Sequence, residues 1–381
     1  MLHLPPLYPI TDATRPESLS AQIRRFGDAG FPLVQFRGKP LDPLAQWTEL
    51  KLALQASADN GGWPLICVND RADLALLAAR EGLAPWGLHL GQEDLPASEA
   101  VRLPGLAGCH FGASTHEASE WDTVDPACDH AGVGPFRGTA TKPDHAAPIG
   151  LAGLRAGCAA LRAQGIAPVA IGGLTLADAP ACFAAGAEAL AIVGEMHRME
   201  DPASFGWEIQ RLRWRARPPF GRNQGIVVLG GSGAGKTTFG RDLAWHLRLP
   251  FQDLDAIIEH QTGRSISAIF AASGEGAFRA LEAGLLPGLL STTAVVALGG
   301  GAWETEANRA AVWNSGFAPL WLAETPARAW ERVGRDPHRP LAQSREAFLA
   351  RWRSRIPAWS LAPMAIPFGH SSRELAAALV D

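Results

Sequence analysis

The sequence predicts two α/β domains in one chain: a (β/α)8 TIM barrel over residues 1–207 and a parallel sheet with flanking helices over residues 224–381. Short apolar segments alternate with helical stretches eight times before residue 195, which is typical of a parallel barrel. An apolar segment at 226–229 then runs directly into a glycine-rich loop, which is typical of a phosphate-binding domain. The length of 381 residues suits two or three domains of about 150 residues each.

The composition gives no reason to expect a nucleic-acid or membrane partner. Hydrophobic residues make up 47% of the chain, charged residues 19%, and the formal net charge is −4. No apolar run reaches membrane-spanning length, and the first residues lack the features of a signal peptide, so we expect a cytoplasmic protein. The five cysteines contain no CxxC pair and are expected to be buried hydrophobes. The sequence does not fix whether the chain forms an oligomer.

Eight apolar segments are expected to form the barrel strands. They are residues 7–10, 33–36, 65–68, 87–90, 107–110, 130–133, 168–171 and 189–193. Helical patterns with good start signals lie between several of them, at 17–29, 42–58 and 151–164. A doubly wound sheet is the alternative, but such a sheet usually has fewer strands.

In a parallel barrel the chemistry gathers where the strands end, so the residues after each strand belong together. They are Arg37, Lys39, Asn69, Asp70, Gln92, Asp94, Ser114, Thr139, Thr141, Lys142, Gly172, Gly173 and Gly194. Asp70 and Asp94 are the hard oxygen ligands that Mg²⁺ prefers, and the cationic residues suit a pyrophosphate. A single aspartate after a strand is most often a helix N-cap, so it is the convergence that favours a site.

The same residues lie in a series of motifs. The series is Leu7-Tyr-Pro-Ile-Thr-Asp12, Val34-Gln-Phe-Arg-Gly-Lys39, Val68-Asn-Asp70, Gly87-Leu-His-Leu-Gly-Gln-Glu-Asp94, Gly112-Ala-Ser-Thr-His116, Thr139-Ala-Thr-Lys142 and Ala170-Ile-Gly-Gly173. In this order it resembles thiamine phosphate synthase, over about residues 4–205. The resemblance implies a barrel that joins a hydroxymethylpyrimidine pyrophosphate to a thiazole phosphate, giving thiamine phosphate and pyrophosphate.

The resemblance also implies residue roles. Asp70 and Asp94 would bind Mg²⁺, and the pyrophosphate and pyrimidine would be bound by Gln35, Arg37, Lys39, Asn69, Ser114 and Lys142. Ser114 and Lys142 would be catalytic, and the thiazole phosphate would be bound by Thr139, Thr141, Gly172, Gly173 and Gly194. Ionising the pyrimidine's C–O bond needs charge stabilisation rather than a strong base, which suits these residue types. The alternative is a barrel that only binds thiamine-pathway ligands as a regulator, and the presence of both aspartates and Lys142 argues against it.

Between the domains, residues 208–223 carry five arginines and the pair Pro218-Pro219. We expect a basic, stiffened linker here, after a final barrel helix. A nucleic-acid patch is the alternative, but no recognition motif accompanies the arginines.

The stretch Gly225-Ile-Val-Val-Leu-Gly-Gly-Ser-Gly-Ala-Gly-Lys-Thr-Thr238 has the strand, loop and helix context of a P-loop. Its ATP-binding residues would be Gly231, Ser232, Gly233, Ala234, Gly235, Lys236, Thr237 and Thr238. Lys236 would reach the β- and γ-phosphates and the Thr237 hydroxyl would hold Mg²⁺. Asp253 and Asp255 are expected on one short strand with their side chains pointing the same way, the first to support Mg²⁺ and the second to orient or deprotonate an acceptor hydroxyl.

Further motifs follow the P-loop. Glu282 stands three residues after Arg279 and is expected to hold it, Val295–Leu298 runs into Gly299, Gly300 and Gly301, and residues 332–339 suit a mobile lid. Together with Arg339-Pro-Leu and Arg355-Ile-Pro, this set resembles shikimate kinase over about residues 224–381.

That resemblance implies a P-loop kinase that uses ATP as co-substrate with Mg²⁺. Shikimate would be bound by Asp255, Arg279, Gly299, Gly300, Gly301 and Arg355. Arg339 would close over the phosphates and Arg332 over the adenine, with Lys236, Asp255 and Arg339 as catalytic residues. A gluconate-kinase-like enzyme is the alternative. The sequence therefore predicts a bifunctional enzyme that acts on small-molecule substrates.

Overall fold

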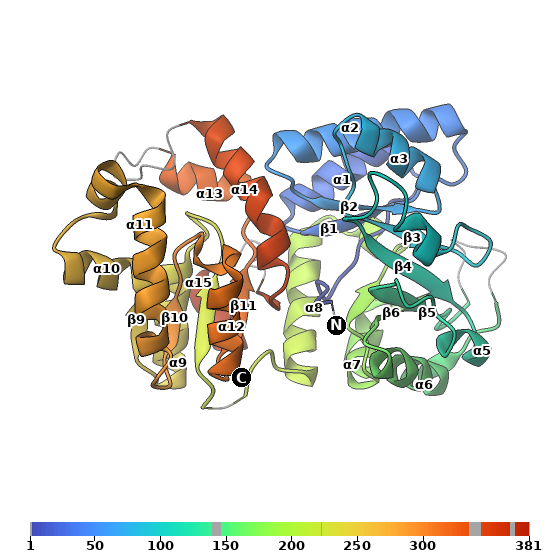
Figure 1. The fold of residues 1–381 in the computed structure, drawn as a ribbon. Coiled ribbons are helices and arrows are strands. Elements are labelled where there is room, and N and C mark those ends of the chain that lie inside the picture. Colours follow the sequence, from blue (N-terminus) through green and yellow to red (C-terminus); the bar gives the residue numbers. More distant parts are fainter. Residues whose placement is uncertain (1, 139–145, 222, 335–343, 366–369, 381) are drawn as a thin grey trace. The chain divides into compact units, whose positions relative to one another are not determined.

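The computed structural model describes residues 2–138, 146–221, 223–334, 344–365 and 370–380 (Figure 1). The chain divides into two compact units. The N-terminal unit comprises Met1–Asp59 and Trp63–Arg217, and the C-terminal unit comprises Asn60–Gly62 and Pro218–Asp381. Each unit is built around its own parallel sheet, so each is described separately.

The sheet of the N-terminal unit has parallel strands in sequence order. They are β1 (Leu33–Phe36), β2 (Leu65–Asn69), β3 (Gly87–Leu90), β4 (His110–Thr115), β5 (His130–Val133), β6 (Ala167–Ile171) and β7 (Ala189–Ala191). These strands are short and largely apolar because helices cover the outer face and side chains fill the interior. All carboxyl ends of the strands meet at one edge, where the polar residues of the predicted site follow them.

Residues 6–11 close this sheet into a barrel. The Tyr8 N–H donates to the Leu190 carbonyl at 2.9 Å on one side, and the Gln35 N–H donates to the Pro9 carbonyl at 2.8 Å on the other. The segment thus forms isolated parallel bridges to both β7 and β1. The prolines at positions 5, 6 and 9 have no N–H to donate, which explains why the ladder is interrupted. The predicted eight-membered barrel is confirmed, with this bridging segment in the place of one strand.

Helices surround the N-terminal sheet (Figure 1). They are α1 (Leu19–Asp28), α2 (Pro43–Asp59), α3 (Ala72–Arg80), α4 (Ala97–Ala100), α5 (Ala118–Trp121), α6 (Gly150–Ala163), α7 (Ala179–Ala184) and α8 (Pro202–Ala216), with short 3₁₀ turns at Leu176–Asp178 and Met196–Arg198. The first begins where the Ser18 side chain accepts from the Ala21 N–H, a standard N-cap that satisfies one free backbone donor. No helix in the described parts of either unit is long and apolar enough to cross a membrane.

The fourth strand differs from its predicted position. The sequence predicted a strand at 107–110, whereas β4 spans His110–Thr115. Residues before it form consecutive turns, because the Leu106 N–H donates to the Leu103 carbonyl and the Cys109 N–H donates to the Leu106 carbonyl. Ser114 therefore lies within a strand rather than after it.

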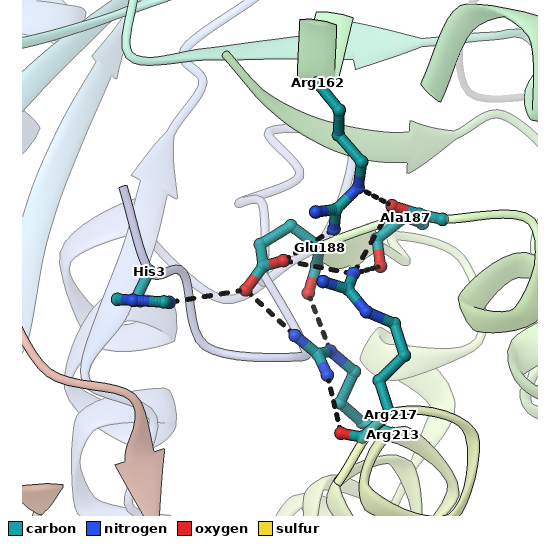
Figure 2. A network of polar contacts seen from close by, with 7 residues as sticks. His3, Arg162, Ala187, Glu188, Arg213 and Arg217 are labelled. Atoms are coloured by element: carbon teal, nitrogen blue, oxygen red, sulfur yellow. Dashed lines mark hydrogen bonds and ion pairs between the residues drawn. The ribbon is translucent and has the colours of Figure 1, made fainter. Parts of the chain in front are cut away.

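The predicted linker also begins too early. Residues 208–216 belong to α8. This helix begins after Asp201, whose side chain accepts a hydrogen bond from the Ser204 N–H, and it has Pro202 in its first turn and Trp214 on its buried face. Its arginines are part of the barrel rather than of a solvated linker. Figure 2 shows three guanidinium groups, from Arg162, Arg213 and Arg217, gathered around the carboxylate of Glu188.

Glu188 immediately precedes β7, and its side chain is only 3% exposed. Its carboxylate lies 2.9 Å from Arg162, 2.9 Å from Arg213 and 3.2 Å from Arg217, with His3 at 3.9 Å. Burial alone would raise the pKa of Glu188, but the contacts with His3 and the arginines outweigh it and lower that pKa to about 2. This cluster ties the end of α8 to the barrel.

The sheet of the C-terminal unit is also parallel, in the order β12-β11-β8-β10-β9. Its strands are β8 (Ile226–Leu229), β9 (Phe251–Asp253), β10 (Val295–Ala297), β11 (Ala318–Leu322) and β12 (Met364–Ala365). Its helices are α9 (Lys236–Leu247), α10 (Leu254–Thr262), α11 (Ile266–Leu289), α12 (Glu306–Asn314), α13 (Pro326–Val333), α14 (Arg345–Trp359) and α15 (Ser372–Ala378), with a 3₁₀ turn at Ala302–Glu304. The central strand β8 runs into the glycine-rich loop, which fits the rule that ligands bind beyond the carboxyl ends of parallel strands.

Candidate active sites

Asp70 follows β2 in a left-handed backbone conformation, with φ of 62°. This conformation is uncommon outside glycine and is often found at functional positions. Its carboxylate forms an ion pair with Lys39, which follows β1. The helix after it, α3, has Arg71 at its N-cap position without a side-chain cap, so Asp70 is not an ordinary capping residue.

Asp94 lies against Asp70, and its Oδ2 accepts the Gly91 N–H at 2.6 Å. Burial, together with the neighbouring charge of Asp70, raises the pKa of Asp94 above its ordinary value, although the Gly91 hydrogen bond opposes this. Two carboxylates that approach each other with one lysine nearby leave negative charge that a cation would neutralise. The described residues contain no cluster of three metal-ligating side chains. Mg²⁺, however, is often held by one or two carboxylates together with substrate phosphates, so this pair fits that ion.

Six further residues predicted for the barrel site fall into three groups. Arg37 and Asn69 lie at the ends of β1 and β2. Arg37 is half-buried, and its side chain forms no hydrogen bond or ion pair with the described residues. Gln35 is 3% exposed inside the barrel, with its Nε2 3.5 Å from the Tyr8 hydroxyl. Thr139, Thr141 and Lys142 lie outside the described residues.

The predicted phosphate-binding glycines follow β6 and β7. Gly172 and Gly173 both have positive φ, at 97° and 63°, and a Cβ on Gly173 would lie 2.8 Å from the Gly138 carbonyl oxygen. Side chains are therefore excluded where this turn packs against the segment after β5. Gly194 follows β7, and a Cβ at this position would meet only Arg198 Nη1, at an ordinary contact distance of 3.5 Å.

Ser114 has a partner that the sequence did not predict. Its Oγ lies 3.1 Å from Nε2 of His89 on the neighbouring strand β3, and Nδ1 of His89 lies 3.5 Å from Nε2 of His130 on β5. The sequence signal for His89 was its place inside the motif that spans residues 87–94. His130 offered none, because a histidine at a strand start is ordinarily unremarkable.

The P-loop adopts its expected conformation between β8 and α9. Gly230, Gly233 and Gly235 have positive φ, and a Cβ on Gly233 would collide with the Ala329 carbonyl. Lys236 is the first residue of α9, and its Nζ donates to the Gly231 carbonyl at 2.9 Å. Backbone N–H groups at such a helix N-terminus attract phosphate.

Thr237 and Asp253 meet as predicted, with Thr237 Oγ1 donating to Asp253 Oδ2 at 2.7 Å. The expectation that Asp253 and Asp255 share a strand was wrong. Strand β9 ends at Asp253, which caps α10 by accepting from the backbone N–H groups of Asp255 and Ala256. Capping turns the chain, so Asp255 lies in the first helical turn.

Two arginines of the C-terminal unit, the half-buried Arg279 and the buried Arg355, pair with its own glutamates. Arg279 binds Glu282 at 2.5 Å, as its spacing predicted, and also Glu275 at 2.6 Å. The Nε of Arg355 lies 2.7 Å from Glu304 Oε1, an ion pair that lacks the alignment of a hydrogen bond. Burial lowers the pKa of Arg355, and the Glu304 charge partly offsets this. Neither Glu275 nor Glu304 was predicted as an arginine partner. Glu275 lies four residues before Arg279 on one helix, so its spacing could have indicated the pair, whereas no spacing or motif marks Glu304.

A cavity of about 580 Å³ brings these groups together. Its lining includes the predicted residues Ser232, Gly233, Gly235, Lys236, Thr237, Thr238, Asp253, Asp255, Arg279, Gly299, Gly300, Gly301, Arg332 and Arg355. Gly231 and Ala234 are buried in the loop, and Arg339 lies outside the described residues. Arg332 binds Glu324 at 2.8 Å and donates to the Gly233 carbonyl at 2.9 Å. Trp359 also lines the cavity, packed against Trp321 and Trp352. A cavity of this size suits small-molecule ligands.

Comparison with known proteins gives a separate match for each unit. The family model described as thiamine monophosphate synthase matches residues 7–196, and the model described as shikimate kinase matches residues 232–367. A thiamine-phosphate synthase of Chloroflexus aurantiacus is 39% identical over 210 residues, covering 54% of this chain and 91% of that protein. One from a Synechococcus species is 38% identical over 197 residues, covering 51% of this chain and 52% of that protein.

The C-terminal half has relatives of its own. A shikimate kinase of Thermobifida fusca is 42% identical over 158 residues, covering 40% of this chain and 91% of that protein. Each half of the chain therefore spans nearly the whole length of at least one relative. This chain belongs to two families, thiamine-phosphate synthase through its N-terminal unit and shikimate kinase through its C-terminal unit.

Proposed function

We propose that the chain is a bifunctional transferase. Its barrel joins a hydroxymethylpyrimidine pyrophosphate to a thiazole phosphate, and its P-loop unit phosphorylates shikimate from ATP. The observation that supports the first reaction is the pair Asp70 and Asp94, with Lys39, at the carboxyl ends of neighbouring strands. For the second, it is the cavity that combines a P-loop with the guanidinium groups of Arg279 and Arg355.

In the P-loop unit, the chain's residues position two substrates. The backbone of residues 231–235 and the ammonium of Lys236 bind the phosphates of ATP. Arg279 and Arg355 bind the planar carboxylate of shikimate, because guanidinium groups match carboxylate geometry. Asp255 lines the same cavity and orients or deprotonates the hydroxyl that attacks.

In the barrel, the residues stabilise a leaving anion. Arg37, Lys39 and Asn69 bind the pyrophosphate as it departs, and Ser114 lies at the pyrimidine. The developing charge is met by fixed cationic and polar groups, which is electrostatic catalysis. In both units Mg²⁺ supplies neutralisation of phosphate charge, with Asp70 and Asp94 as its protein ligands in the barrel and Thr237 and Asp253 in the P-loop unit.

Two assays of the purified full chain test this proposal. One follows pyrophosphate release from the pyrimidine and thiazole substrates with and without Mg²⁺, and the other follows ADP formation with shikimate or with gluconate. We expect Mg²⁺-dependent pyrophosphate release and shikimate-dependent ADP formation. Binding of the thiamine precursors without pyrophosphate release would favour the regulator alternative, and ATP turnover that responds to gluconate alone would overturn the shikimate assignment.

A further inference from the structure

Two histidines of the barrel lie next to Ser114 in a row that crosses three strands. In the strand register, His89 on β3 is paired with Gly112 on β4, and Gly112 is paired with His130 on β5. Because Gly112 has no side chain, the two imidazole rings meet across it, with centroids 5.5 Å apart. Ser114 lies two residues beyond Gly112 on the same face of β4, which brings its Oγ to His89.

The space for this pair depends on Gly112. A Cβ at that position would lie 2.5 Å from His130 Cε1 and 2.7 Å from His89 Nδ1. Both distances are too short for real atoms, so any other residue would push the rings apart. The contact between His89 and His130 is therefore built into the barrel rather than incidental.

Both imidazoles are buried. His130 is 0% exposed and His89 is 8% exposed. Such burial disfavours the charged imidazolium relative to the neutral ring. A neutral imidazole has one N–H donor and one acceptor nitrogen, so the two rings and the hydroxyl must share their protons in a defined order.

Hydrogen-bond accounting fixes that order. Among the described residues, Nδ1 of His130 has no hydrogen-bond partner. A buried N–H without an acceptor is rarer and more costly than an unused lone pair, so His130 carries its proton on Nε2. That N–H faces Nδ1 of His89, which must accept. The proton of His89 is then on Nε2, which donates to Ser114 Oγ at 3.1 Å.

We propose that His89 is a positioning residue that, oriented by His130, makes Ser114 Oγ an acceptor and so leaves the serine hydrogen to be donated to the pyrimidine substrate. The ligand atom must then be a hydrogen-bond acceptor, such as a ring nitrogen. This inference rests on the proposed barrel reaction for its kinetic consequence. The proton order itself does not depend on that reaction.

Imidazole ¹⁵N chemical shifts of the full-length protein test the proton order without any activity. We expect His89 to be neutral at pH 7.5, with a protonated Nε2 and an unprotonated Nδ1. The His89→Gln variant assigns the signal, and His110→Gln serves as the matched control, because His110 lies on β4 but bonds to Asp129 instead. A protonated Nδ1, or a doubly protonated ring, would overturn the proposal.

A double-mutant cycle tests the kinetic role. We expect His89→Leu and Ser114→Ala each to lower kcat for pyrophosphate release roughly tenfold, and the double variant to be no slower than Ser114→Ala. His89→Gln should restore most of the rate, because its amide N–H can still donate to Ser114. Losses that multiply in the double variant would mean that His89 acts independently, which contradicts the proposal. If the wild-type barrel releases no pyrophosphate, the proposed function fails, and the ¹⁵N shifts still decide the proton order.

Discussion

The two units place their site residues by different means. In the C-terminal unit, the phosphate-binding groups come from one continuous loop between β8 and α9, so their spacing along the sequence defines the site. In the N-terminal unit, the groups arrive one or two at a time from the ends of separate strands. Groups after β1 to β4 meet because these strands pair directly, and residues 6–11 bring the ends of β6 and β7 round to β1. The same class of chemistry, stabilising phosphate charge, thus rests on a local motif in one unit and on the whole fold in the other.

The two sites also differ in the sign of the charge they leave for a ligand. The C-terminal cavity is lined by Arg279 and Arg355, and the protein's own Glu275 and Glu304 pair with them. The barrel holds adjacent carboxylates, and the protein's own Lys39 binds one of them. In each case an internal group of opposite charge pairs with a residue that we propose to bind the ligand. If the proposed site residues are correct, a substrate or ion that binds there displaces an internal ion-pair partner.

The largest effect is expected from Asp94→Ala in the barrel. Loss of one of two carboxylates removes half of the proposed Mg²⁺ ligands, and metal stabilisation of a phosphate leaving group contributes several kcal/mol. Pyrophosphate release should fall by about 10³-fold or more, while shikimate-dependent ADP formation stays unchanged. The matched control is Asp73→Ala, since Asp73 pairs with Arg71 away from Asp94. A variant that keeps Mg²⁺-dependent release near the wild-type rate would remove Asp94 from the metal site.

Lys236→Ala should have the opposite selectivity and affect only the P-loop unit. It should lower ADP formation by on the order of 10²-fold, the usual consequence of losing a transition-state charge contact. Pyrophosphate release by the barrel should not change. Arg241→Ala is the control, because Arg241 is an exposed cation on the same helix that packs over Phe251. Equal losses in the two variants would show that the effect is electrostatic at long range rather than contact with phosphate.

Most of what the sequence predicted correctly is local, although some local features were also missed. The P-loop, the Arg279–Glu282 pair and most barrel strands follow from spacing and periodicity, because each depends on residues a few positions apart. The strand at 110–115 was misplaced, since turn hydrogen bonds rather than apolar content decide where it begins. Asp255 was misassigned because an N-cap ended the strand at Asp253.

The contacts that sequence could not supply join residues distant along the chain. Arg355 meets Glu304 across 51 positions, His89 meets His130 across 41, and Arg162 meets Glu188 across 26. Each is created by strand order and helix packing. The basic stretch that looked like a linker is the clearest case, because only the fold reveals the carboxylate that its arginines surround.

Glu188→Gln tests whether the buried cluster of Glu188 and its arginines holds α8 to the rest of the barrel. The folded pKa of Glu188 is lowered from 4.5 to about 2, so its contribution to stability is present above about pH 4.5 and is lost as pH falls toward 2. That contribution is on the order of 3 kcal/mol at neutral pH. Hydrogen–deuterium exchange of the full chain at pH 7 should therefore quicken in β7 and α8 peptides of the variant, with no change in P-loop peptides.

A matched pair is available on the same helix. Glu208 binds Arg211 at 2.9 Å, but both side chains are about one-third exposed. Glu208→Gln should therefore change exchange very little, as exposed ion pairs contribute about 1 kcal/mol or less. If the two variants behave alike, the buried arginine cluster does not hold α8 to the barrel.

The smallest effect, and the one most specific to the charge argument, is expected from Glu304→Gln. The Glu304 carboxylate is 41% exposed and pairs with Arg355, whose side chain is only 8% exposed. In the proposed function, shikimate's carboxylate displaces this partner, and a partly exposed pair is worth about 1 kcal/mol or less. Neutralising Glu304 should therefore lower KM for shikimate by up to about fivefold with kcat unchanged. Glu306→Gln, an exposed neighbour in the first turn of α12, should leave KM unchanged. A higher KM in the Glu304 variant would mean instead that Glu304 holds Arg355 in its binding orientation, so that the internal partner prepares the site rather than competing for it.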